Sequence, residues 1–237
     1  MESPNLDKTL EIFENTEKFT NLIYQEIKPF LQGNILEIGS GIGSYSKKIA
    51  KDFPQNQILL SEIDPKYIQT LKALFKTKPN INRIKLDLNS EKDFQMLSNQ
   101  FDSAFALNVL EHVEDDLSAL HNVYSVLKKN GTFILLVPCH KFLFNTLDQA
   151  VGHYRRYTKK DLIEKIHKTD FKIEKIFHTN VPGIIGWYIT GNILKKHSLN
   201  KKAMKLFDQL VPFFQILEKH IFRKKIGLSM IVILKKQ

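Results

Sequence analysis

Short apolar runs of strand length alternate along the chain with longer amphipathic stretches of helical spacing. This alternation predicts an α/β fold with a mostly parallel sheet and helices on both faces, because parallel neighbours need a crossover between them. Seven strands are expected, at 34–38, 57–62, 82–87, 102–107, 132–138, 171–178 and 227–234. Helices are expected between the first five strands, at 44–52, 65–76, 91–99 and 114–128.

Two segments lie outside this alternation. Residues 7–31 have the apolar spacing of one or two amphipathic helices, and 179–226 form a helical insertion of nearly fifty residues between the last two strands. We expect the insertion to stand as a cap over the carboxyl edge of the sheet. The expected single domain therefore comprises N-terminal helices (1–32), a sheet core (33–178), the cap (179–226) and a final strand (227–237), which we expect to be antiparallel.

The positive charge is concentrated at the end of the chain. The formal net charge is +10, yet the segment from Lys195 onward holds eleven Lys or Arg against only two acids, Asp208 and Glu218. The first 194 residues hold 24 cations and 23 acids, so they are nearly neutral. A basic surface of this kind could hold the protein to anionic lipid.

Targeting and membrane signals are absent from the printed sequence. The first residues lack the cationic and apolar regions of a signal peptide, and the single cysteine, Cys139, excludes an intramolecular disulfide. No uncharged apolar run approaches the roughly 20 residues that a spanning helix needs. We therefore expect a cytoplasmic protein, with peripheral contact at the inner face of the membrane as an option.

A glycine-rich turn follows the first predicted strand, in ILEIGSGIGSYS. Gly39, Gly41 and Gly43 would let the backbone approach a ligand closely, and a nucleotide-like ligand is the usual reason. A dinucleotide fingerprint would need glycine at position 44, where this chain has Ser44. Here Glu37 precedes the first glycine by two residues.

Acidic residues end the next two predicted strands: Glu62 in ILLSEIDP and Asp87 in IKLDLNS. Together with FDSAFALNVLEHVEDD and VLKKNGTFIL, the glycine turn and these acids resemble the motifs of class I S-adenosylmethionine-dependent methyltransferases. The resemblance covers about residues 30–178 and the final strand, and it implies a Rossmann-like fold.

The resemblance also implies a cofactor and its site. S-adenosylmethionine would donate the methyl group and leave as S-adenosylhomocysteine. Glu37 would orient the amino group of the donor, Glu62 would bind its ribose, and Asp87 would contact its adenine. The full set of expected cofactor-binding residues is Glu37, Gly39, Ser40, Gly41, Gly43, Glu62, Ile63, Asp87, Leu88, Asn108 and Val109.

Methyl transfer from a sulfonium is an in-line displacement, and a hydroxyl or neutral nitrogen acceptor can also need a base. His140 and His153 are the candidate catalytic bases, because both follow the fifth strand on the acceptor side. His112, after the fourth strand, is a candidate substrate-binding residue. The sequence shows no close cluster with metal-ligand spacing, so no metal is expected.

The segment GHYRRY, 152–157, is similar to a methyltransferase subgroup in which Leu-Asp precedes this motif, here Leu147 and Asp148. Arg155 and Arg156 could clamp an anionic acceptor, and Tyr154 and Tyr157 could stack on a ring. The alternative is that one arginine pairs with Asp148 and the other is solvated. Trp187, in PGIIGWYITGNIL, is expected to line the acceptor side or to pack on the sheet.

These observations predict a methyltransferase acting on a small-molecule, lipid-linked or glycan-linked acceptor, with oxygen as the expected acceptor atom. An RNA methyltransferase is the first alternative: the basic C-terminal segment favours it, but no RNA-binding motif is present, so a nucleic-acid partner is not expected. The second alternative is a partner protein that binds the donor without turnover.

Overall fold

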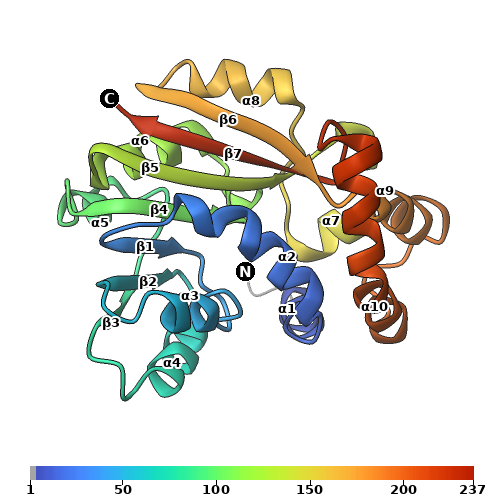
Figure 1. Cartoon of the computed structure of the whole chain (residues 1–237), viewed down its shortest axis with the longest axis horizontal. Helices are drawn as coiled ribbons and strands as arrows, with labels where there is room; N and C mark the ends of the chain where they lie inside the picture. The colour runs from blue at the N-terminus through green and yellow to red at the C-terminus, as the bar shows by residue number, and fades with distance from the viewer. Residues whose placement is uncertain (1–3) are drawn as a thin grey trace.

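A seven-stranded sheet with the order β3-β2-β1-β4-β5-β7-β6 forms the centre of the computed structural model, which describes residues 4–237 (Figure 1). The first five strands are parallel, and β7 runs antiparallel to both of its neighbours, β5 and β6. All seven predicted strands and the antiparallel last strand are confirmed. The strands are β1 (Ile35–Ile38), β2 (Ile58–Glu62), β3 (Ile81–Lys85), β4 (Phe101–Leu107), β5 (Leu127–Pro138), β6 (Phe171–Thr179) and β7 (Ser229–Lys236).

Helices cover both faces of the sheet, as the alternation predicts. One face packs against α5, α6 and α8 through Phe94, Leu120 and Leu162, and the other against α2 and α3 through Ile27 and Ile49. All five side chains are fully buried. The helices are α1 (Pro4–Glu14), α2 (Glu17–Ile27), α3 (Ser46–Asp52), α4 (Pro65–Leu74), α5 (Glu91–Gln95), α6 (Asp116–Val126), α7 (Thr146–Val151) and α8 (Lys159–Ile166), with short turns η1 (Lys28–Phe30), η2 (Leu110–His112) and η3 (Lys141–Leu143).

Several predicted boundaries were wrong around β5. The helix expected at 114–128 ends at Val126, and the strand expected from residue 132 begins at Leu127. Leu127 pairs with Phe101 and Thr132 pairs with Ser103, so the residues between Leu127 and Thr132 bulge out of the ladder. The KKNG stretch is therefore a bulge inside β5 and not a separate turn before it.

Two other predicted ends differ. The helix expected at 91–99 stops at Gln95, and β3 stops at Lys85, so Asp87 lies in the loop after the strand. Helix starts were predicted more closely. Asp64 accepts a hydrogen bond from the Lys66 N–H at 2.7 Å and caps α4, which begins at Pro65.

The 179–226 segment folds as α9 (Val181–Trp187), η4 (Tyr188–Ile193), α10 (Lys201–Leu217) and η5 (Glu218–Phe222). Together with α1 and α7 these elements occupy one end of the molecule, beyond the carboxyl ends of β4 and β5 (Figure 1). Asp208 on α10 accepts a hydrogen bond from the Phe19 N–H at 2.8 Å, which joins α10 to α2. Among the described residues no helix is both long and apolar enough to cross a membrane.

Candidate active site

The turn between β1 and α3 can be formed only by a glycine-rich sequence. Gly39, Gly41 and Gly43 have φ angles of +71°, +52° and +85°, which side chains rarely tolerate. At Gly39 space is also lacking, because an added Cβ would lie 2.5 Å from a methyl group of Val109. Val109 follows β4, so this contact brings the ends of β1 and β4 close together.

Glu62, at the end of β2, points its carboxylate into this turn. Oε2 accepts a hydrogen bond from the Gly41 N–H at 2.8 Å, and Oε1 accepts one from the Ile63 N–H at 2.8 Å. Burial raises the pKa of Glu62, although these backbone donors act against the rise. The Ile63 side chain beside it is 53% exposed. A carboxylate at the rim of the turn is suited to accept hydrogen bonds from ligand hydroxyls.

Glu37 lies beneath the turn, completely enclosed by protein. Ser46 Oγ donates to Glu37 Oε2 at 2.5 Å, and burial raises the pKa of Glu37 to about 8. Ser40 Oγ is also buried, and it is one of the few buried side-chain atoms of the described residues without a hydrogen-bond partner. Contact between Glu37 and a donor amino group would therefore pass through the loop, as the resemblance implies.

The remaining predicted donor residues lie at the ends of β3 and β4. Asp87 Oδ1 accepts from the Asn89 N–H at 2.9 Å, and the Leu88 carbonyl accepts from Asn122 Nδ2 at 2.9 Å. Asn108 is exposed, with φ at +54°, and its N–H donates to the Leu136 carbonyl at 2.9 Å. Their roles toward adenine and the sulfonium stay predictions.

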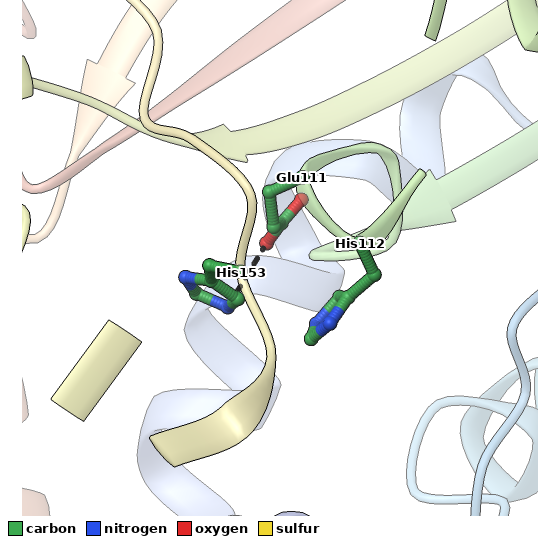
Figure 2. Close-up of side chains that lie close together, drawn as sticks. All are labelled: Glu111, His112 and His153. Atoms are coloured by element: carbon green, nitrogen blue, oxygen red, sulfur yellow. Dashed lines mark ion pairs between the residues drawn. The ribbon is translucent and has the colours of Figure 1, made fainter. Parts of the chain in front are cut away.

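On the acceptor side, three residues from two segments come together (Figure 2). Glu111 and His112 belong to η2 after β4, and His153 follows α7. The ring centroids of His112 and His153 are 4.7 Å apart in an edge-to-face arrangement. The Tyr154 N–H donates to the Glu111 carbonyl at 2.8 Å, which fixes the segment after α7 against η2.

Glu111 is the unusual member of this group. Its side chain is 0% exposed, and both carboxylate oxygens are without a hydrogen-bond partner among the described residues. His153 Nε2 is 3.8 Å from Glu111 Oε1, too far for a hydrogen bond (Figure 2). Burial raises the pKa of Glu111 to about 7 and lowers the pKa of His112 to about 3. The Glu111 oxygens are enclosed and the His153 side chain is 9% exposed, so a ligand would reach this ion pair from the His153 side.

Asp148 on α7 holds the other side of His153. Its Oδ1 lies 2.8 Å from His153 Nδ1 and accepts from Arg156 Nε at 2.8 Å, while its Oδ2 accepts from Trp187 Nε1 at 3.0 Å. Burial acts to raise the pKa of Asp148, but the His153 hydrogen bond and the Arg156 charge bring it below its ordinary value. Asp148 is therefore a charged anchor for the loop, α7 and the cap.

The GHYRRY arginines both pair with protein carboxylates. Arg156 is buried, and its guanidinium lies 4.7 Å from the Trp187 ring centroid in addition to its contact with Asp148. Arg155 is not simply solvated, because its Nη1 lies 3.0 Å from Asp116 Oδ2. The expected alternative in which one arginine pairs with Asp148 thus holds for Arg156, and the clamp on an anionic acceptor stays a prediction.

The two tyrosines differ from each other. Tyr157 is 2% exposed and donates its hydroxyl to Asp116 Oδ2 at 2.7 Å, so its ring lies in the core. Tyr154 is 55% exposed, and the Arg155 guanidinium lies 5.6 Å from its ring centroid. His140 contacts other residues. Its Nε2 lies 3.0 Å from the Gly227 carbonyl oxygen, and its ring centroid lies 6.4 Å from that of His178, with the two rings nearly parallel.

The sequence did not predict the grouping of Glu111, His112 and His153. One donor atom from each lies within 4.8 Å of the others, so the three residues could hold a metal ion. The sequence shows no cluster with metal-ligand spacing because these three residues come together only in the fold, and the expectation of no metal stays a prediction. The signal available in the sequence was the adjacent Glu-His pair directly after β4.

The strand order, the glycine turn after β1 and the acid at the end of β2 define a Rossmann-like domain of the methyltransferase type. Residues 36–133 match the methyltransferase domain family. The match covers part of the chain, and the fold around it is similar to that of solved structures described as methyltransferases.

One curated relative is malonyl-[acyl-carrier protein] O-methyltransferase 1 of Ilyobacter polytropus, 26% identical over 71% of this chain and 66% of its own length. The chain thus spans just under two thirds of that relative. Two solved structures share the fold. Phosphoethanolamine N-methyltransferase 2 of Haemonchus contortus, in complex with S-adenosylmethionine, has a TM-score of 0.64 (17% identity, 95% of this chain and 56% of that one). The [4+2]-cyclase SpnF has a TM-score of 0.60 (17% identity, 93% of this chain and 80% of that one).

Proposed function

We propose that this protein transfers the methyl group of S-adenosylmethionine to a hydroxyl oxygen of a small or carrier-linked acceptor. The observation that carries the proposal is the unbridged pair formed by His153 Nε2 and the buried Glu111 carboxylate, 3.8 Å apart beside the end of β4. A relative whose name specifies O-methyltransferase supports oxygen as the acceptor atom.

The donor would bind along the carboxyl ends of the first four strands, where open α/β sheets hold ligands. Glu62 would exchange its Gly41 and Ile63 hydrogen bonds in part for ribose hydroxyls, and Asp87 with Leu88 would receive the adenine. Glu37 would act through Ser40 and Ser46, because its own carboxylate is enclosed. In this arrangement the methyl group faces Asn108 and the acceptor side.

The chemical step needs one displacement and one proton transfer. The acceptor oxygen forms a bond to the methyl carbon while the carbon–sulfur bond breaks, and its electron pair leaves with sulfur to give S-adenosylhomocysteine. The hydroxyl proton passes to His153 Nε2, and Asp148 accepts the hydrogen bond of Nδ1–H and stabilises the resulting cation. Alignment of the reacting atoms supplies most of the acceleration, with positioning worth on the order of 7–11 kcal/mol.

Glu111 and His112 complete the acceptor side. Glu111 is enclosed, so the acceptor would meet His153 Nε2, and the Glu111 carboxylate would act on the imidazole across 3.8 Å. His112 packs edge-to-face against His153 and would restrict how the acceptor ring or chain enters. Tyr154, which is exposed, is the expected stacking partner for an aromatic acceptor.

Single-turnover methyl transfer with isotope-labelled donor tests this proposal. The purified protein is offered a panel of hydroxyl acceptors, namely phenols, carrier-bound hydroxyacyl thioesters and isoprenoid alcohols, and S-adenosylhomocysteine is measured. With an accepted substrate, His153→Ala should lower the rate roughly 10²-fold to 10⁴-fold. His140→Ala should leave it nearly unchanged, because His140 Nε2 is already directed at the Gly227 carbonyl.

Two outcomes would contradict the proposal. Equal rates for wild type and His153→Ala would remove the base, and donor binding without turnover on any acceptor would favour a binding protein or a different reaction. The second outcome has a precedent in the fold, since a neighbour of the same architecture is named a cyclase. Retained RNA with steep salt dependence would instead favour the nucleic-acid alternative.

A further inference from the structure

Large apolar side chains are exposed on the helices of the cap. On α10, Leu206, Leu210 and Phe213 are 59%, 42% and 58% exposed, and their i, i+4, i+7 spacing places them on one side of the helix. The opposite side carries the buried Val211 and Asp208, which is bonded to α2. The helix therefore has two apolar faces, and only one of them is used inside the protein.

The segment before α10 repeats this arrangement. Ile185 and Ile193 on α9 and η4 are 64% and 60% exposed, and the exposed Tyr188 and Ile189 lie between them along the chain. Glu218 connects the two parts: its Oε1 accepts from the Val181 N–H at 2.7 Å, so the end of α10 meets the start of α9. Both apolar faces thus belong to one end of the molecule (Figure 1).

Charge distinguishes this surface from an ordinary apolar patch. From residue 180 to 226 the chain has only two acids, and both are engaged internally: Asp208 accepts from the α2 backbone, and Glu218 is 6% exposed. Lysines remain outside, among them Lys202 and Lys205 on the first turns of α10. The outer surface of the cap therefore combines exposed apolar groups with cations and presents no acid from this segment.

We propose that this surface docks on an anionic phospholipid bilayer, with the apolar face of α10 in the interfacial region and the lysines on lipid phosphates. Exposed apolar side chains flanked by lysines on a helix too short to span are the features of interfacial helices. A second copy of the chain is a poorer occupant, because face-to-face association would bring the same lysines together. Charge complementarity thus selects a lipid surface.

Docking would also bear on the acceptor. Trp187, the last residue of α9, donates its Nε1–H to Asp148 at 3.0 Å, and Asp148 holds His153. One end of α9, which belongs to the same cap as α10, therefore lies at the wall of the candidate acceptor site. An acceptor drawn from the bilayer is the consequence we infer, and this part alone rests on the proposed function.

Co-sedimentation of the full chain with vesicles tests docking without the methyl donor. Vesicles of phosphatidylglycerol and phosphatidylcholine (1:1) should retain the protein at low salt, and pure phosphatidylcholine vesicles should retain at least tenfold less. Leu210→Asp/Phe213→Asp should reduce binding at least tenfold, and Lys202→Glu/Lys205→Glu should reduce it severalfold. The matched controls, Met96→Asp and Lys72→Glu/Lys76→Glu, alter equally exposed positions on α4, α5 and their flanks and should bind like wild type.

Circular dichroism and donor binding by calorimetry keep the variants interpretable, because folded variants retain both signals. Absence of binding to anionic vesicles at low salt would overturn the docking surface. So would equal binding to neutral vesicles, or a stable dimer that Leu210→Asp/Phe213→Asp dissociates. Failure of methyl transfer with vesicle binding intact would overturn only the proposed function.

Discussion

His153 Nδ1 lies 2.8 Å from Asp148 Oδ1, while its Nε2 faces the buried Glu111 carboxylate across 3.8 Å. One nitrogen is thus held by Asp148, and the other is directed at a carboxylate without a hydrogen-bond partner among the described residues. Such a pair fixes the ring orientation before any ligand arrives, which is the requirement for a general base.

Asp148→Asn tests the positioning of His153. We expect kcat to fall about 10²-fold or more while KM for the donor stays nearly constant. Asp148 lies on α7, whereas the proposed donor site lies at the ends of the first four strands. The variant also leaves the buried Arg156 guanidinium without its carboxylate, at a cost of about 3–5 kcal/mol in stability. Steady-state kinetics and urea unfolding measure the two effects separately.

The double variant Asp148→Asn/Arg156→Met is the control for this prediction. It removes both buried charges, so most of the lost stability should return while kcat stays low. A double variant that recovers stability and kcat together would show that Asp148 is only structural.

Glu62→Gln should weaken donor binding by about tenfold to a hundredfold. Charge-assisted hydrogen bonds are worth about 1.5–3 kcal/mol each, and the neutral amide loses the charge while it keeps the size of the side chain. Calorimetry with S-adenosylhomocysteine measures the affinity. Asp64→Ala is the control two residues away: it removes the cap of α4, so stability should fall by about 1 kcal/mol with little change in affinity. Equal losses of affinity in both variants would contradict a donor-binding role for Glu62.

Glu37 should make stability depend on pH. Burial raises its folded pKa to about 8 from an ordinary 4.5, so the folded state binds the proton more tightly than the unfolded chain. Its contribution is therefore fully present below pH 4.5 and is lost as the pH rises toward 8. Between pH 5 and 7 the unfolding free energy of wild type should fall on the order of 2 kcal/mol relative to Glu37→Gln. Urea unfolding at several pH values measures this difference, and parallel pH curves for the two proteins would contradict it.

The sequence predicted the sheet well because strand identity is a local property here. Strands such as ILEI and FDSAFAL are short runs of mostly apolar, buried residues, and the breakers between them are local too. The β5 bulge could not be read in the same way, since it depends on Leu127 pairing with Phe101, a contact between different strands. Local patterns therefore predict elements, and long-range pairing decides where they end.

The candidate site shows the same difference between local motifs and long-range contacts. The glycine turn and Glu62 were predictable because each lies at the end of a strand with a motif of its own. Glu111 and His153 were not paired by any local signal, since about forty residues separate them and the contact depends on Tyr154 binding the Glu111 carbonyl. The burial of Arg156 was not predictable either. The sequence offered Asp148 as a partner, but no local signal indicated how deeply Arg156 lies in the protein.

Gly39→Ala should destabilise the protein by about 2–5 kcal/mol. The φ angle of +71° costs an L-residue roughly 1–2 kcal/mol, and the new Cβ would meet Val109 at 2.5 Å, an overpacking that costs about 1–3 kcal/mol. Adding Val109→Ala to Gly39→Ala should recover only the stability lost to overpacking. Gly186→Ala is the matched control, because no atom lies within 4 Å of its added Cβ and the residue is helical. Chemical unfolding of the four proteins checks these values, and full recovery in the double variant would exclude backbone strain.

Zn²⁺ should inhibit methyl transfer by occupying the acceptor side. Imidazole and carboxylate are ligands that Zn²⁺ accepts, and Glu111, His112 and His153 present one donor atom each within 4.8 Å. Asp148 already holds the second nitrogen of His153, as carboxylates do behind many metal-bound histidines.

His112→Ala should raise the inhibitory Zn²⁺ concentration roughly tenfold, since it removes one of three ligands, whereas His121→Ala on the exposed side of α6 should not change it. Rates measured across a Zn²⁺ titration, and again after chelation, test this expectation. If Zn²⁺ instead accelerates the reaction and chelation abolishes it, the three residues serve as metal ligands in catalysis. The proton of the acceptor would then be displaced by the metal, and His153 would not be the base.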